Sequence, residues 1–193
     1  MEKRGSQTII SSSKALFWKH GIKRVSVEEI CEHAGISKMT FYRHFKNKNE
    51  VAEKVLLKIL DKGISDYLAI MNQPIPYPKK IEKIIELKHH SSDHISQEFL
   101  KDIYQNEKLG LVKHVQEYTV KFTAQLVKDF KDAQKKGFIR KDLKIEFILI
   151  LLDNFNTLLF DKRITDTYKD SHDAIMEITN FLFYGILPRD KEV

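Results

Sequence analysis

Two short helices joined by a glycine turn are encoded between residues 26 and 48, and this segment constrains the fold more than any other. Ser26 followed three residues later by Glu29 is the pattern of a capping box at a helix start. Gly35 ends that helix, because glycine enters the left-handed conformation without steric cost. Ser37 is then the N-cap of a second helix. The order helix, tight turn, helix predicts a helix-turn-helix motif.

The second helix of this motif has one face for a core and one for a ligand. At 100° per residue, Phe41 and Phe45 share a face, and Met39 and Arg43 lie nearly opposite them. A basic, hydroxyl-bearing outer face suits a DNA major groove, with Arg43 matched to guanine O6 and N7 and Met39 to a thymine methyl; Lys38 is a third candidate for base reading. The alternative is a solvated charged helix. The expected core of the motif comprises Ile30, Ala34, Gly35, Phe41 and Phe45.

Residues 34–48, Ala-Gly-Ile-Ser-Lys-Met-Thr-Phe-Tyr-Arg-His-Phe-Lys-Asn-Lys, resemble the signature of the tetracycline-repressor (TetR) family of transcriptional regulators. Residues 15–22 are similar to the first helix of that family and the loop that closes it, and close similarity covers roughly residues 7–55. Met39 stands where many members carry glycine, and Cys31 where alanine is usual. The resemblance implies a DNA-binding regulator that acts as a homodimer.

The same resemblance implies roles for individual side chains. The lysine that matches Lys48 holds a phosphate together with a helix start, and the matches to Thr40, Tyr42 and His44 contact the DNA backbone or bases. We expect Tyr42→Ala or Lys48→Ala to weaken DNA binding and to leave the fold intact. The expected DNA-contacting residues are Ser26, Val27, Ser37, Lys38, Met39, Thr40, Tyr42, Arg43, His44, Lys46 and Lys48.

Charge is distributed unevenly along the chain. Residues 1–62 carry 13 Lys/Arg against 7 Asp/Glu, a net charge of +6, whereas residues 63–193 carry 20 of each. All of the excess positive charge therefore lies in the segment that holds the helix-turn-helix, as expected of a surface that meets phosphate. The alternative, a basic surface kept for solubility alone, predicts no such asymmetry.

Cysteine content and hydropathy predict a cytoplasmic protein. The single cysteine, Cys31, excludes an internal disulfide and is expected to be a small buried side chain of the first motif helix. No apolar secretion signal follows the charged residues 2–4. The longest aliphatic run, residues 147–152, is far shorter than a bilayer span, so no membrane partner is expected.

Signatures of catalysis and cofactor binding are absent from the sequence. It contains no Walker loop, no dinucleotide glycine fingerprint, no His-Glu-x-x-His and no paired-cysteine pattern. We therefore expect a protein that is not an enzyme and needs no cofactor. His90 and His94 have a spacing that suits zinc on a helix, but residues 91–93 read as a helix cap between them, so no metal site is expected.

The whole chain is predicted to be all-α, with about nine helices. A helix over residues 8–20 precedes the motif, and a long helix over 47–71 follows it and ends before the prolines of residues 74–78. We expect a helix-turn-helix domain over 1–46, the linking helix 47–71, and an effector-binding and dimerisation domain over 72–193. Further helices are expected near 79–90, 93–106, 111–136, 143–161 and 171–186.

The carboxyl-terminal part is expected to form the dimer and hold an effector. Residues 147–160 and 174–187 are apolar on more than one face, as in helices that pack on their own subunit and on a partner. The alternative is a buried hairpin within a monomer. Nine of the 12 phenylalanines fall between residues 99 and 183, which permits an apolar pocket but is equally expected of a core. The weak candidates for effector binding are Phe99, Tyr104, Tyr118, Phe122 and Asn154.

The combined expectation is a repressor that binds a palindromic operator as a homodimer and is released by a small-molecule effector. Two alternatives remain open: a transcriptional activator, and a co-regulator of the same fold that has no operator of its own. The sequence does not distinguish an activator from a repressor.

Overall fold

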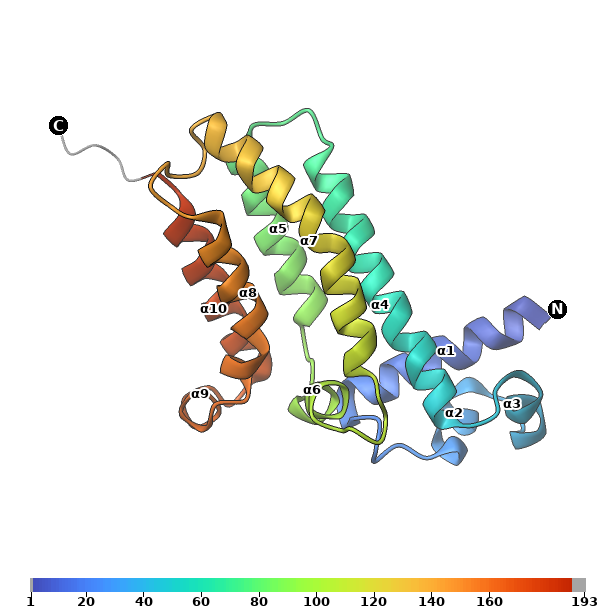
Figure 1. The fold of residues 1–193 in the computed structure, drawn as a ribbon. Coiled ribbons are helices and arrows are strands. Elements are labelled where there is room, and N and C mark those ends of the chain that lie inside the picture. Colours follow the sequence, from blue (N-terminus) through green and yellow to red (C-terminus); the bar gives the residue numbers. More distant parts are fainter. Residues whose placement is uncertain (1, 189–193) are drawn as a thin grey trace. The chain divides into compact units, whose positions relative to one another are not determined.

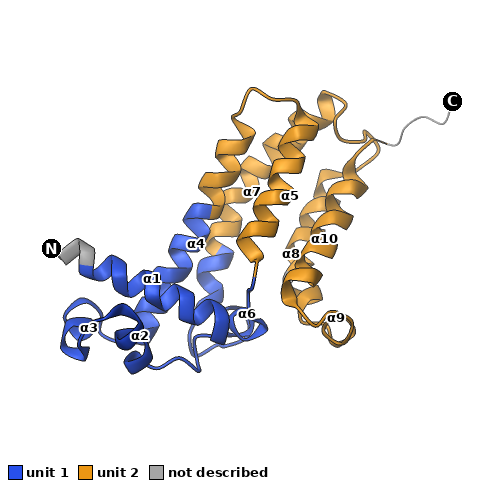
Figure 2. Cartoon of the chain, turned by 180° about the vertical axis from the view of Figure 1, so that it is seen from behind, with its two compact units in different colours: residues 1–62, 94–116 blue, residues 63–93, 117–193 orange. Residues whose placement is uncertain are grey.

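The chain is all-α, as predicted. A computed structural model describes residues 2–188, and that part of the chain contains ten helices and no strand (Figure 1). The helices form two compact units (Figure 2). Unit 1 comprises the residues up to Lys62 together with His94–Gln116, and unit 2 comprises Gly63–Asp93 and the residues from Glu117 onward.

Unit 1 is built on the first helix. Its interior consists of side chains that are almost inaccessible to solvent, including Ile9, Phe17, Ile30, Phe41 and Val51. Burying large aliphatic and aromatic side chains of this kind is the main favourable term in folding. The helices of unit 1 are α1 (Glu2–His20), α2 (Val27–Ala34), α3 (Lys38–His44), α6 (Gln97–Tyr104) and the first part of α4 (Lys48–Met71).

Helix α6 packs against α1 although it lies far along the chain. The backbone N–H of Ser96 donates to the carbonyl oxygen of Trp18 at 2.9 Å, and the rings of Trp18 and Phe99 are 5.4 Å apart. The sequence predicts one domain over residues 72–193, whereas residues 94–116 belong to the same compact unit as the helix-turn-helix. The reason is the apolar face of α6, where Phe99 and Ile103 are buried.

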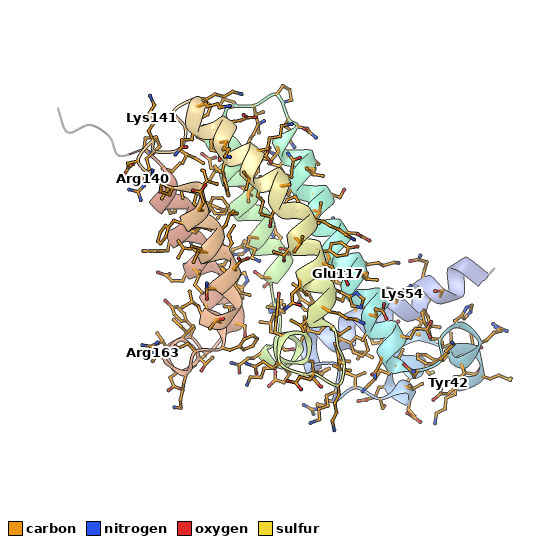
Figure 3. All side chains as sticks on the ribbon, in the orientation of Figure 1. Tyr42, Lys54, Glu117, Arg140, Lys141 and Arg163 are labelled. Atoms are coloured by element: carbon orange, nitrogen blue, oxygen red, sulfur yellow. The ribbon has the colours of Figure 1, made fainter. Side chains whose placement is uncertain are left out.

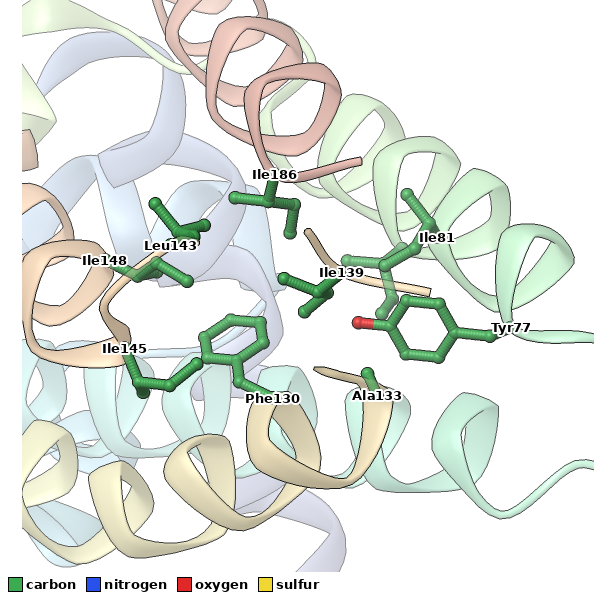
Figure 4. Close-up of a cluster of buried hydrophobic side chains, with 10 residues drawn as sticks. Tyr77, Ile81, Phe130, Ala133, Ile139, Leu143, Ile145, Ile148 and Ile186 are labelled. Atoms are coloured by element: carbon green, nitrogen blue, oxygen red, sulfur yellow. The ribbon is translucent and has the colours of Figure 1, made fainter. Parts of the chain in front are cut away.

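Unit 2 has an apolar interior shared by helices and a loop (Figure 4). Tyr77, Ile81, Phe130 and Ile148 are among its buried side chains. The loop over 138–143 is held by Gln134, whose Nε2 donates to the carbonyl oxygens of residues 140 and 143 at 3.0 and 2.8 Å. The helices are α5 (Tyr77–Ser92), α8 (Ile145–Leu159), α9 (Lys162–Thr167), α10 (Ser171–Ile186), the end of α4 and most of α7 (Val112–Lys135).

Three helices differ from the expected pattern. Helix α1 begins at Glu2 rather than near residue 8. The short α9 was not expected, because it is too brief to show apolar periodicity; the Asp161 carboxylate caps it by accepting from the Arg163 N–H at 2.8 Å. Helix α6 begins later than expected, because His94 has a left-handed φ of 54° and Ser96 is the N-cap. Ser96 Oγ accepts the Phe99 N–H at 3.2 Å.

Two glycines with positive φ offer a matched test of the α1–α6 packing. Alanine at Gly21 or Gly35 costs about 1–2 kcal/mol for the left-handed conformation. A Cβ at Gly21 would also lie 2.8 Å from the Glu98 Cβ, whereas nothing lies within 4 Å at Gly35. We expect Gly21→Ala to lower the free energy of unfolding more than Gly35→Ala, measured by urea unfolding. Equal losses would contradict the close approach of α6 to this turn.

Candidate nucleic-acid interface

The first motif helix begins and ends as the sequence predicts. Ser26 Oγ accepts the Glu29 N–H at 3.1 Å, and the Glu29 carboxylate accepts the Ser26 N–H at 2.6 Å, which completes the capping box. Gly35 has φ of 64° in the left-handed region. The following N–H, of Ile36, reaches the Cys31 carbonyl oxygen at 3.0 Å and closes the helix end.

Helix α3 divides into a buried and an exposed face. Phe41 and Phe45 are buried with ring centroids 6.1 Å apart, so they anchor α3 in unit 1. Ser37 caps the helix by accepting the Thr40 N–H at 3.1 Å. Ile30 is also buried, whereas Ala34 is half-buried and Gly35 is exposed at the turn. The two aromatic side chains therefore fix which face of α3 is outward.

The outward face of α3 exposes large side chains that a monomeric core would bury. Met39 is 82% exposed and Tyr42 is 54% exposed, and Figure 3 shows Tyr42 projecting away from the helices. The Tyr42 ring packs edge-on against Phe41 with centroids 5.3 Å apart, which fixes its direction. Arg43 and Lys46 are exposed as well. An exposed apolar and basic surface of this kind is typical of a recognition surface.

Lys38 already has an anionic partner. Its ammonium forms an ion pair with the Glu28 carboxylate of α2, and this contact lowers the pKa of Glu28 and raises the pKa of Lys38. Both side chains are exposed, so the pair contributes little to stability. To contact a base, Lys38 must give up its ion pair with Glu28. Among the residues that the structure describes, Arg43 has no ion pair of this kind to give up.

Lys48 is built into the motif from the first turn of α4. Its Nζ donates to the carbonyl oxygens of Lys23 and Val25 at 3.0 and 2.5 Å, and burial lowers its pKa. An ammonium has three N–H donors, so one remains for a phosphate. These two hydrogen bonds hold the link between α1 and α2, so we expect Lys48→Ala to lower the stability of the fold as well as the affinity for DNA.

The remaining expected contact residues lie nearby with varied exposure. Ser26, Val27 and Thr40 are half-buried, and Ser37 is exposed. His44 is half-buried against α1, since a Cβ at Gly5 would lie 2.7 Å from its Nε2. Ten of the eleven expected residues thus belong to α2, α3, their caps or the start of α4, and Lys46 lies in the connection between α3 and α4.

Two residues that support this surface, Asn47 and Asp102, were not among the residues predicted from the sequence. Asn47 caps α4 by accepting the Glu50 N–H at 3.0 Å, and the Glu50 carboxylate accepts the Lys46 N–H at 2.7 Å. The spacing Asn-x-x-Glu was a visible signal for this cap. Asp102 of α6 accepts the Lys23 N–H at 2.7 Å, and no local pattern indicates a contact 79 residues away.

Cys31 is buried in the first motif helix, and burial raises the pKa of its thiol. A raised thiol pKa disfavours the reactive thiolate. Among the residues that the structure describes, no group of three or more metal-binding side chains is placed to hold an ion, and no helix is long and apolar enough to cross a membrane. His90 lies in α5 and His94 beyond its end.

The weak effector candidates are divided between the two units. Phe99 and Tyr104 lie in unit 1, where Phe99 is buried against Trp18. The other three lie in unit 2. Phe122 packs edge-on against Tyr67 with centroids 5.0 Å apart, and the exposed Asn154 donates to the Ile150 carbonyl of its own helix at 2.8 Å.

Residues 9–55 match the family model described as "Bacterial regulatory proteins, tetR family". The HTH-type transcriptional regulator UidR of Escherichia coli (strain K12) is 24% identical over 171 residues, which is 84% of this chain and 84% of UidR. The HTH-type transcriptional repressor KstR2 of Rhodococcus jostii (strain RHA1) is 23% identical over 151 residues, or 75% of this chain and 72% of KstR2.

Solved structures show the same fold. A TetR-family transcriptional regulator from Cytophaga hutchinsonii is similar over 98% of both chains, with a TM-score of 0.71 and 18% identity. The fatty acid degradation regulator FadR from Bacillus halodurans is similar over 96% of this chain and 97% of its own, with a TM-score of 0.66 and 16% identity. The motif geometry and these matches define a DNA-binding transcriptional regulator. Over residues 9–55 the chain belongs to the TetR family of bacterial regulatory proteins.

The double use of Lys48 gives a test with a neighbouring lysine as control. We expect Lys48→Ala to lower the free energy of unfolding by about 1–2 kcal/mol, the low end for charged hydrogen bonds because the ammonium is part-exposed. Lys46→Ala removes an exposed charge and leaves the loop contacts in place. Chemical denaturation of both variants measures the difference. Equal stability of the two would contradict a structural role for Lys48.

Tyr42 gives a test that separates binding from folding. We expect Tyr42→Ala to weaken DNA binding by about 1–3 kcal/mol, because it removes an exposed ring and hydroxyl from the outward face of α3. The Tm of Tyr42→Ala should stay near that of the parent, because about half of the Tyr42 surface is exposed to solvent. Tyr42→Phe, which keeps the ring, separates the contribution of the hydroxyl. Unchanged affinity in Tyr42→Ala would remove this residue from the interface.

Proposed function

We propose that this regulator is a cytoplasmic repressor that binds a palindromic operator as a homodimer and leaves it when a small molecule binds. The observation that carries the proposal is the exposed face of α3, where Met39 and Tyr42 are displayed beside Arg43. The net charge of +6 in residues 1–62 supplies the attraction to phosphate. The name of KstR2 as a repressor supports repression over activation.

Within the interface, phosphate and base contacts fall to different residues. Arg43 is assigned to guanine and Met39 to a thymine methyl, because both are exposed on the outward face of α3. Tyr42 and the free donor of Lys48 are assigned to phosphates. The start of α4 adds the positive end of a helix dipole beside Lys48. Phosphate contacts position the motif and the two base contacts specify sequence.

A homodimer is supported by exposed apolar side chains on two helices of unit 2. Five of the eight large hydrophobic side chains recorded as exposed lie on α8 and α10. Exposed apolar patches of this kind mark interaction sites, whereas isolated exposed residues do not. One recognition helix covers too few base pairs for specificity, so two related copies on a palindrome are required. The five residues are Phe147, Ile150, Leu158, Phe181 and Tyr184.

Release by an effector follows from population shift. A small molecule that binds more tightly to the conformation whose recognition helices are wrongly spaced lowers operator occupancy. In vitro selection from a random DNA pool tests the proposal as a whole. We expect a palindromic sequence to be enriched, and a reporter under that sequence to be more active in a strain that lacks the regulator. Failure to enrich any sequence would favour the co-regulator alternative, and a less active reporter would favour an activator.

The proposed dimer face has a matched control on another helix of the same unit. Phe181 on α10 is 78% exposed, and Val120 on α7 is 75% exposed. We expect Phe181→Glu to give a monomer at low micromolar concentration, because a charge is costly in an apolar interface, and Val120→Glu to remain a dimer. Light scattering measures both. A dimeric Phe181→Glu variant would show that α10 does not form the interface.

A further inference from the structure

The beginning of α1 lies beside α3 (Figure 2), and Gly5 of α1 faces His44, the last residue of α3. A Cβ at Gly5 would lie 2.7 Å from His44 Nε2 and 3.3 Å from His44 Cε1. Side-chain Cβ atoms do not approach other heavy atoms to within 3.0 Å, so any larger residue at position 5 would have to displace the imidazole. The missing side chain of Gly5 therefore provides the space in which this ring lies.

Close approach of another side chain distinguishes Gly5 from the other glycines inside helices. A glycine in a helix interior lowers stability by up to about 1 kcal/mol relative to alanine, so it calls for a physical reason. Gly63 of α4 and Gly185 of α10 also lie within helices. A Cβ at either of these positions would meet nothing within 4 Å, whereas a Cβ at Gly5 would meet the tip of the His44 ring.

The backbone of α1 is fixed close to Gly5. Ile9 and Ile10, one turn further along the helix, are buried in the interior of unit 1. The Lys58 ammonium of α4 donates to Gln7 Oε1, which ties the first turns of α1 to a second helix. Because α1 is held from both the core and α4, it does not withdraw freely from His44.

The backbone of α3 is fixed next to His44 as well. Phe41 and Phe45 are buried, and the Phe45 N–H donates to the Phe41 carbonyl oxygen at 3.0 Å, which closes the end of the helix. The imidazole itself turns about two side-chain bonds and is the softest part of the contact. A side chain at position 5 would therefore move the His44 ring rather than either helix.

His44 lies at the edge of α3 that borders α1. At about 100° per residue, it is about 60° around the helix from Phe41 and about 100° from Arg43. It is half-buried, whereas Arg43 is exposed. Side chains at the edge of a recognition helix lie nearer to the sugar-phosphate strands than to the base edges. His44 is thus placed for a phosphate.

The orientation of the ring leaves one nitrogen for such a contact. The three ring atoms nearest to the Cβ position at Gly5 are Nε2, Cε1 and Cδ2 of His44, so Nδ1 lies farther from α1 than these atoms. An imidazole nitrogen that carries a proton is a hydrogen-bond donor. With Nε2 against α1, Nδ1 is the nitrogen that can donate to an acceptor outside the protein.

We propose that Gly5 is a positioning residue for DNA binding. Its missing side chain lets the His44 imidazole lie against α1, and in that orientation Nδ1 donates to a phosphate of the operator. This inference rests on the proposed function, since it names the residue that orients one of the proposed DNA contacts. Gly5 acts through His44, so its contribution to DNA binding depends on the presence of the imidazole.

A double-mutant cycle tests this dependence. The parent, Gly5→Ala, His44→Ala and the double variant are titrated against the DNA sequence enriched by in vitro selection, with fluorescence anisotropy at one salt concentration. We expect Gly5→Ala to weaken binding about threefold to tenfold, the range for one lost hydrogen bond. In the His44→Ala background, Gly5→Ala should have no further effect, because there is no ring to displace. Equal weakening in both backgrounds would overturn the proposal.

The Tm without DNA separates displacement of the ring from damage to the fold. We expect Gly5→Ala to have a Tm equal to or above that of the parent, because alanine favours the helix and only a mobile ring is displaced. Gly63→Ala is the matched control, since it makes the same change inside a helix with nothing within 4 Å. A Tm of Gly5→Ala clearly below that of the parent would show that the helices move apart, and would overturn the proposal.

The imidazole can also be observed in the free protein. Its Cε1–H resonance in the proton NMR spectrum is assigned by its absence from His44→Ala. We expect this resonance to shift in Gly5→Ala and to stay in place in Gly63→Ala. An unshifted resonance in Gly5→Ala would show that the ring is not displaced and would overturn the proposal.

DNA binding by the parent distinguishes failure of this inference from failure of the proposed function. If the parent binds its selected sequence and Gly5→Ala binds it equally well, the role of Gly5 is overturned and the regulator stands. If the parent selects no DNA, the proposed function is overturned and the DNA contact of His44 with it. A shifted ring resonance in Gly5→Ala would then still establish the packing of His44 against Gly5.

Discussion

The link between α1 and α2 is held from both sides, and the direction of the recognition helix depends on it. The Asp102 carboxylate accepts the Lys23 N–H, while the Lys48 ammonium donates to the carbonyl oxygens of Lys23 and Val25. Gly21 allows α6 to approach closely, because a Cβ at this position would clash with the Glu98 side chain. Helix α2 starts at the end of this link, and α3 follows α2 after a tight turn. The orientation of the outward face of α3 therefore depends on these few contacts.

One desolvated lysine can serve two purposes in this fold. Lys48 has exchanged water for the carbonyl oxygens of Lys23 and Val25, so its charge contributes to the fold. The third N–H of its ammonium is the donor that we propose for a DNA phosphate.

Exposed apolar side chains are concentrated on the elements for which partners are proposed. Met39 and Tyr42 lie on α3, and a larger set lies on α8 and α10. The surface of α3 is small and flanked by positive charge, which suits the groove of a duplex. The surface of α8 and α10 is extended and mainly apolar, which suits a second copy of the same chain. This difference in charge matches the two partners that we propose, a polyanion for α3 and a second copy of the chain for α8 and α10.

The sequence by itself determined the helical class, the helix-turn-helix and the buried pair Phe41 and Phe45. Caps, left-handed glycines and the helical period depend on residues within about four positions of one another, so they can be read along the chain. Only the tertiary structure places α6 with the first three helices and brings Lys48 to the loop between α1 and α2. Those facts depend on packing between residues such as Lys23 and Asp102, 79 positions apart, whose meeting no local pattern encodes.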